Sequence, residues 1–84
     1  MKTFTKIMDV LCENTSLGDK VYLLKENDNL FEHGLDSFQM MRVIVGLERS
    51  LNFVFKDEDL LVVNFSTIES IVNSVNAITM NQTI

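Results

Sequence analysis

Three segments of the sequence place apolar residues at the spacing of one helix face. The first set, at positions i, i+3, i+4 and i+7, comprises Phe4, Ile7, Met8 and Leu11. The other two sets are Met40, Val43, Ile44, Leu47 and Leu51, and then Ile68, Ile71, Val72 and Val75. Residues spaced in this way form a stripe along an α-helix that packs against a core. We therefore predict helices over residues 3–14, over residues 36–51, and from residue 66 to residue 77 or 78.

Capping residues stand at the start of two of these helices. Either Asp36 or Ser37 can supply the N-cap oxygen of the second helix, and Gln39 follows Asp36 by three positions. Ser66 and Glu69 have the same spacing ahead of the last helix. A hydroxyl or carboxylate followed three residues later by Glu or Gln is the pattern of a capping box. We predict that both pairs form such boxes.

The connections between these helices are less regular. Residues 15–36 contain apolar clusters but no sustained period, which predicts a long loop held against the helices by its apolar side chains. Asp57-Glu58-Asp59 predicts a short helix running through Leu61, because acidic side chains in a first turn complement the helix dipole. Short strands at 53–55 and 61–63 are the alternative, but two isolated strands would be marginal.

The predicted fold class is therefore all-α, a small bundle of three longer helices plus one short helix. The chain has 84 residues, which is enough for one domain. We expect a single domain over residues 1–84, with a core from about residue 3 to 78 and a flexible tail at 79–84.

Composition and charge argue against several classes of partner. The formal charge of −5 disfavours binding to nucleic acid or anionic lipid and suits transient docking on basic patches of other proteins. No stretch approaches the roughly 18 apolar residues of a membrane span, and the N-terminus lacks the features of a signal peptide. The single cysteine, Cys12, has no partner for an internal disulfide. We expect a cytoplasmic monomer without membrane insertion.

The sequence offers no catalytic or metal-binding constellation. His33 is the only histidine, so a Ser-His-Asp arrangement would require Ser37, His33 and Asp36, which are too close in sequence for a relay. Cys12 lies near the first helix stripe and is expected to be a small packing residue. Cys and His do not cluster at metal-ligand spacing, and the scattered glycines do not form a phosphate-binding loop. We predict no catalytic residues and no metal site.

One run of residues resembles a known modification site. The run Leu30-Phe31-Glu32-His33-Gly34-Leu35-Asp36-Ser37-Phe38, followed by an apolar helix, resembles the phosphopantetheine attachment site of acyl and peptidyl carrier proteins. The core of that site is Gly-hydrophobic-Asp-Ser-hydrophobic, which matches Gly34, Leu35, Asp36, Ser37 and Phe38. Residues 57–60 resemble the start of the family's short third helix, and residues 64–68 resemble the start of its fourth. The resemblance covers most of the chain, from about residue 4 to 78.

This resemblance implies a modified serine. A phosphopantetheinyl transferase would move 4′-phosphopantetheine from coenzyme A to Ser37, and the thiol of that arm would carry acyl or aminoacyl groups as thioesters. The start of a helix also stabilises the phosphodiester that results. Further implied partners are an acyl- or aminoacyl-loading ligase or adenylation enzyme, and a downstream synthase, transferase or thioesterase. The alternative is that Ser37 only caps the helix.

The second predicted helix carries another apolar row: Phe38, Met41 and Val45. The resemblance implies that this row belongs to a docking face, and the candidate charged contacts around it are Glu32, Asp36, Arg42 and Glu48. The alternative is that the row is buried in the core.

This helix also departs from the family pattern. Arg42 and Arg49 stand where fatty-acid carriers usually have acidic residues, and Gln39 replaces another. This departure favours a specialised pathway, such as polyketide, nonribosomal peptide, aminoacyl-transfer or special-lipid synthesis. The alternatives are the housekeeping fatty-acid carrier and a helical adaptor that carries no arm.

Overall fold

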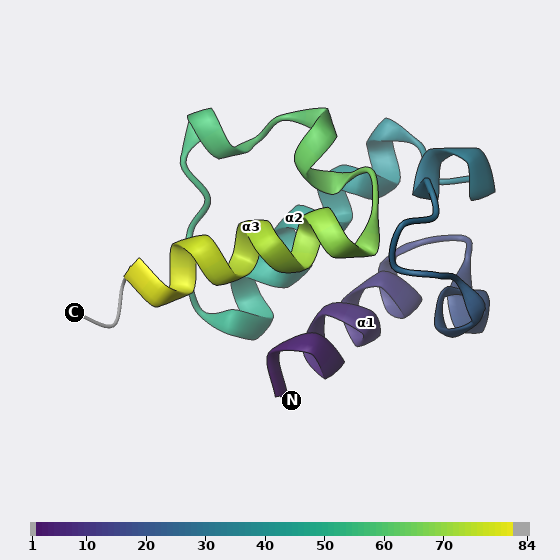
Figure 1. Cartoon of the computed structure of the whole chain (residues 1–84), viewed down its shortest axis with the longest axis horizontal. Coiled ribbons are helices and arrows are strands. Elements are labelled where there is room, and N and C mark those ends of the chain that lie inside the picture. The colour runs from purple at the N-terminus through teal and green to yellow at the C-terminus, as the bar shows by residue number, and fades with distance from the viewer. Residues whose placement is uncertain (1, 82–84) are drawn as a thin grey trace.

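A computed structural model describes residues 2–81 (Figure 1). Its α-helices are α1 (Lys2–Asn14), α2 (Ser37–Leu51) and α3 (Ile68–Asn81). Its short 3-10 helices are η1 (Gly18–Leu23), η2 (Leu30–His33), η3 (Asp57–Asp59) and η4 (Val62–Phe65). No strand occurs within residues 2–81, so the strands considered at 53–55 and 61–63 are wrong. The all-α prediction, with three longer helices, is confirmed.

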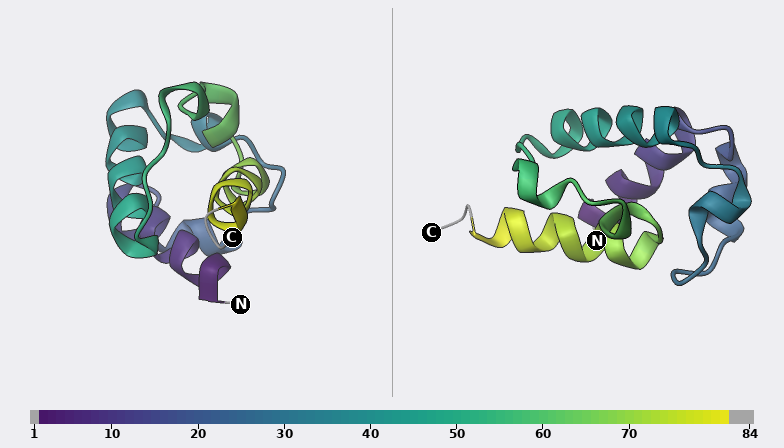
Figure 2. Two further views of the ribbon diagram at one scale, coloured as in Figure 1. Left: turned by 90° about the vertical axis from the view of Figure 1, so that its left-hand side faces the viewer. Right: turned by 90° about the horizontal axis from the view of Figure 1, so that it is seen from above.

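The three α-helices surround one core. Figure 2 shows α2 and α3 on opposite sides of it, with α1 closing a third side. Every element except η3 contributes a buried apolar side chain to this core. Three of its aromatic rings pack edge to face: Phe53 on Phe55 with centroids 4.7 Å apart, and Phe55 on Phe65 at 5.3 Å. Edge-to-face packing is a favoured geometry because the ring edge is positive and the ring face negative.

Helix α2 presents one apolar row to this core and another to solvent. Met40, Val43 and Leu47 are buried, as the helix stripe predicts, and Ile44 and Leu51 pack against them at its edge. The second row is exposed: Phe38 by 81%, Met41 by 64% and Val45 by 44%. The alternative in which this row joins the core is therefore wrong, because its residues project from the opposite side of the helix.

Helix α1 approaches α2 closely at Gly46. A Cβ atom placed on Gly46 would lie 2.8 Å from Val10 Cγ1 and 3.1 Å from Asn14 Nδ2. Val10 is itself buried in the core, so its methyl group has little room to withdraw. Gly46 is therefore the residue that permits this close contact between the two helices.

The segment 15–36 is more regular than the expected loop. It contains η1 and η2, each too short to leave a recognisable period in the sequence. Val21 and Leu30 are fully buried, which confirms that apolar side chains hold the segment against the helices. Backbone hydrogen bonds add to this anchoring. The Leu30 N–H donates to the Ser66 carbonyl at 2.8 Å, and the Glu69 N–H donates to the Glu26 carbonyl at 3.0 Å.

The short helix predicted from Asp57 through Leu61 is instead two separate turns. The first turn, η3, ends at Asp59, and η4 begins at Val62. Leu60 and Leu61, which lie between them, are 42% and 54% exposed. Core contacts therefore do not hold these two leucines in a continuous helix.

The start of α3 also differs from the prediction. The Thr67 hydroxyl accepts a hydrogen bond from the Ser70 N–H at 3.0 Å, and the Ser70 hydroxyl accepts one from the Thr67 N–H at 3.1 Å. This is a reciprocal capping box one residue later than the predicted pair of Ser66 and Glu69. Ser66 instead donates to the Val63 carbonyl at 3.1 Å, because it closes the η4 turn.

The end of α3 lies beyond the predicted residue 77 or 78. The helix continues to Asn81, and the Thr79 hydroxyl donates to the Val75 carbonyl at 2.9 Å within it. The first three residues of the expected tail, 79–81, are thus helical. The other three, 82–84, lie outside the described residues.

Candidate functional site

Ser37 is the first residue of α2 and is exposed. The preceding residue, Asp36, is the N-cap: its Oδ1 accepts a hydrogen bond from the Gln39 N–H at 2.8 Å. The Asp36 carbonyl accepts a second hydrogen bond from the Met40 N–H at 2.9 Å. The sequence left open whether Asp36 or Ser37 caps the helix, and the structure assigns the cap to Asp36. The Ser37 hydroxyl is therefore not required to hold the helix start.

The residues before Ser37 turn the chain into α2. Gly34 ends η2 with φ of +110°, a backbone conformation that favours glycine. Leu35 is buried, and its N–H donates to the Leu30 carbonyl at 3.1 Å. A buried leucine between the exposed Gly34 and Asp36 anchors the turn, so the start of α2 has a fixed position at the surface.

The cap leaves two donors of the first turn open. Asp36 accepts hydrogen bonds from the N–H groups of Gln39 and Met40, and those of Ser37 and Phe38 belong to the first-turn donors that have no partner within an α-helix. The start of an α-helix carries about half an elementary positive charge. Such an end suits an anionic group next to Ser37.

Gln39 has a role that sequence reasoning missed. Its Oε1 accepts hydrogen bonds from the Ser16 N–H at 2.8 Å and from the Ser16 hydroxyl at 3.3 Å. The predicted reciprocal bond of the Gln39 side chain to the Asp36 N–H is thus replaced by a bond to the turn after α1. No feature of the sequence relates positions 16 and 39, because the contact depends on how α1 and α2 pack.

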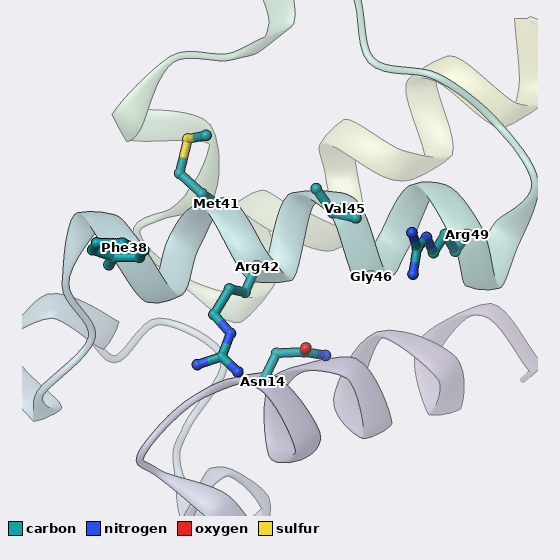
Figure 3. Close-up of a pocket in the computed structure, with 7 residues that line it drawn as sticks. All are labelled: Asn14, Phe38, Met41, Arg42, Val45, Gly46 and Arg49. Carbon is teal, nitrogen blue, oxygen red and sulfur yellow. The ribbon is translucent and has the colours of Figure 1, made fainter.

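A groove of about 300 Å³ lies between the exposed face of α2 and the end of α1 (Figure 3). Its lining residues are Asn14, Phe38, Met41, Arg42, Val45, Gly46 and Arg49. Four of these, Phe38, Met41, Arg42 and Val45, are residues that the sequence places on the docking face. Asn14, Gly46 and Arg49 complete the lining.

The other predicted docking residues do not line this groove. Glu32 and Asp36 are exposed on η2 and at the cap of α2. Glu48 is half-buried, and its Oε2 accepts a hydrogen bond from the Phe55 N–H at 2.9 Å. The charge of Glu48 is therefore engaged with the connection that follows α2.

Two side chains outside the groove lining have raised pKa values: Cys12 in α1 and Tyr22 in η1. Desolvation, and then the hydrogen bond from Cys12 Sγ to Asp19 Oδ1 at 3.5 Å, raise the pKa of the Cys12 thiol. This agrees with the predicted packing role, since a raised pKa disfavours the reactive thiolate. The Tyr22 hydroxyl donates to Asp9 Oδ1 at 2.8 Å, and this bond raises the pKa of Tyr22 to about 12.

Residues 2–81 contain no group of three or more His, Cys, Asp or Glu side chains that could hold a metal ion. Within the same range, no helix combines the length and apolar character that crossing a membrane would require.

Comparison with protein families gives a match to the phosphopantetheine attachment site over residues 5–75, most of the chain. The chain belongs to this family. Its members carry 4′-phosphopantetheine and act as carrier modules that interact with modifying and synthase enzymes. The resemblance and the cofactor prediction are thus confirmed. No curated protein matched the chain.

The residues at the start of α2 fit this prosthetic group. Attachment through a phosphodiester requires an accessible hydroxyl, and Ser37 provides one at the surface. The open N–H groups of Ser37 and Phe38 are suited to a neighbouring phosphate. Residues 5–75, which match the family, include this segment.

Proposed function

We propose that Ser37 is the attachment residue and that the protein carries acyl or aminoacyl groups on its arm. The observation that carries the proposal is the division of roles at the start of α2. Asp36 caps the helix, so the adjacent exposed Ser37 hydroxyl is left for modification. The alternative role for Ser37, as the helix cap, is taken by Asp36.

The attachment step is a phosphoryl transfer catalysed by a separate phosphopantetheinyl transferase. Ser37 Oγ attacks the phosphorus next to the pantetheine of coenzyme A, and a P–O bond of the pyrophosphate breaks. The hydroxyl proton is lost and adenosine 3′,5′-bisphosphate leaves. When bound, the arm supplies the thiol that forms thioesters. This chain supplies the fixed, exposed helix end and the surface on which other enzymes dock.

Intact-mass measurement tests this proposal directly. Incubation with coenzyme A and a broad-range transferase should add one arm per chain, and Ser37→Ala should abolish the addition. Ser16→Ala and Ser66→Ala are matched controls that should leave it unchanged. Labelling that persists in Ser37→Ala, or that is lost in either control, would overturn the assignment.

We further propose that the protein serves a specialised pathway in the cytoplasm, as an aminoacyl, peptidyl or dedicated acyl carrier. The groove along α2 supports this proposal because it contains Arg42 and Arg49 and no carboxylate. Its partners are then a loading ligase or adenylation enzyme and a downstream synthase, transferase or thioesterase. The test is to load the arm with a general fatty-acid acyltransferase, which should accept Arg42→Glu better than the wild type. Equal rates would show that this helix face does not select partners, and would remove the basis for a specialised pathway.

A further inference from the structure

The groove along α2 combines apolar and positively charged groups in a defined order. Phe38 and Val45 lie on one stripe of the helix, with Met41 beside them. Arg42 and Arg49 are seven residues apart, which is about two turns and roughly 10 Å along the helix axis. Figure 3 shows the two guanidinium groups on either side of Val45. Val45 thus lies between two cations along the helix axis, and Phe38 and Met41 extend the apolar surface toward the start of α2.

The charge of the groove is opposite to that of the whole protein. The chain has a formal charge of −5, yet no carboxylate lines the groove. The nearby Glu48 carboxylate is hydrogen bonded to the Phe55 N–H instead. Helix α1 ends at Asn14 in the groove, and its C-terminus contributes only about half a negative charge. Two guanidinium groups outweigh this contribution, so the groove is locally positive.

We propose that the groove docks a partner protein that presents an apolar side chain between two carboxylates about 10 Å apart. The apolar residues of the groove would be buried against the partner's apolar side chain, and the two arginines would select a partner of opposite charge. This inference deepens the proposed carrier function by naming the partner chemistry at the docking surface. A symmetric second copy of this chain is a poorer occupant, because the twofold axis would bring arginines against arginines.

The test uses two designed helical peptides as probes. One has Glu at positions i and i+7 with Leu at i+3 and i+4, and the other has Lys in place of each Glu. Amide chemical shifts of the full-length protein, with and without the arm, report binding and its location. At low salt the Glu peptide should bind about tenfold more tightly than the Lys peptide, with shifts at residues 38–49. Net charge alone predicts the opposite order.

Two double variants with the same change in net charge distinguish the effect of the groove's charge from the effect of the protein's overall charge. Arg42→Glu with Arg49→Glu changes the protein charge by the same amount as Lys20→Glu with Lys56→Glu, two exposed positions outside the groove. The first pair should reverse the peptide preference and the second should keep it. Rising ionic strength should reduce the preference.

Three results would overturn the docking proposal. They are a tighter complex with the Lys peptide, an equal response of the two variant pairs, and shifts confined to residues outside α2. Self-association that blocks the groove would favour a second copy of the chain and also count against the proposal. None of these measurements requires a modified Ser37. The docking proposal can therefore be contradicted while the attachment proposal stands, and the reverse is also possible.

Discussion

The two faces of α2 have similar residue types but different tasks. Met40 and Leu47 on one face are buried in the core, whereas Met41 and Val45 on the other face are 64% and 44% exposed. The hydrophobicity of a side chain therefore does not tell which face stabilises the fold. What distinguishes the faces is the presence of packed neighbours, so stability and partner binding can be changed separately in this one helix.

The largest expected effect is on the core face. Leu47→Ala removes a fully buried side chain and should lower the free energy of unfolding by about 2–5 kcal/mol. Val45→Ala, on the exposed face two residues away, should cost less than about 0.5 kcal/mol. Chemical denaturation of both variants measures the difference. A similar cost at both positions would show that the exposed row packs against the protein.

The next largest effect is expected where α1 and α2 meet. Gly46→Ala should destabilise the protein by about 1–3 kcal/mol through overpacking against Val10, which outweighs the gain of about 1 kcal/mol in helix propensity. Val10→Ala removes the clashing methyl groups and serves as the matched background. The two substitutions should be non-additive, with the Gly46→Ala penalty greatly reduced in Val10→Ala. Additive losses would contradict the contact.

A smaller difference is expected at the start of α2. Asp36→Ala removes the cap and should cost about 0.5–2 kcal/mol, whereas Ser37→Ala should be nearly neutral. Thermal unfolding followed by circular dichroism compares them. If Ser37→Ala unfolds the protein, Ser37 has a structural role and the attachment proposal loses its main support.

The smallest effect concerns Tyr22, which is 50% exposed, slightly more than Val45 at 44%, but is hydrogen bonded to Asp9. Its pKa is raised to about 12 in the folded protein, above the ordinary value of 10.0. The bond therefore stabilises the fold below pH 10, and this contribution is lost as the pH rises from about 10 to about 12.

Ultraviolet absorbance can follow this ionisation, since the chain has one tyrosine and no tryptophan. The tyrosinate midpoint should lie near 12 and should fall in Asp9→Asn, where the acceptor carboxylate is removed. A wild-type midpoint that Asp9→Asn does not change would show that the bond does not form in solution. Tyr22 would then be, like Val45, an exposed side chain that contributes little to stability.

The sequence predicted those features that depend on local spacing. The α1 and α2 stripes, the second apolar row beginning at Phe38 and the position of Ser37 at the start of α2 follow from residue order and helix geometry, whereas the sequence leaves the exposure of that row open and the structure decides it. The start of α3 did not, because both Ser66 and Thr67 have a hydroxyl and a suitable partner three residues later. Backbone geometry chooses between them, and η4 takes up Ser66.

Contacts between distant residues could not be predicted. Glu48 is a charged residue on α2, and only the path of the chain after α2 brings the Phe55 N–H to its carboxylate. The bond between Gln39 and Ser16 and the contact between Gly46 and Val10 likewise depend on how α1 lies against α2. These contacts determine which polar and charged side chains of α2 are already bonded within the protein and which are left to contact a partner.

The backbone bonds from Leu30 to Ser66 and from Glu69 to Glu26 bear on the order of folding. They connect the segment before Ser37 to residues that are synthesised after α2. Closing such distant pairs costs chain entropy, which slows their formation relative to local helix turns. We expect α1 and α2 to gain protection from hydrogen exchange first, and the Leu30 amide to gain it only when α3 does. A transferase that acts during synthesis would thus encounter Ser37 before the segment that precedes it has formed its contacts with Ser66 and Glu69.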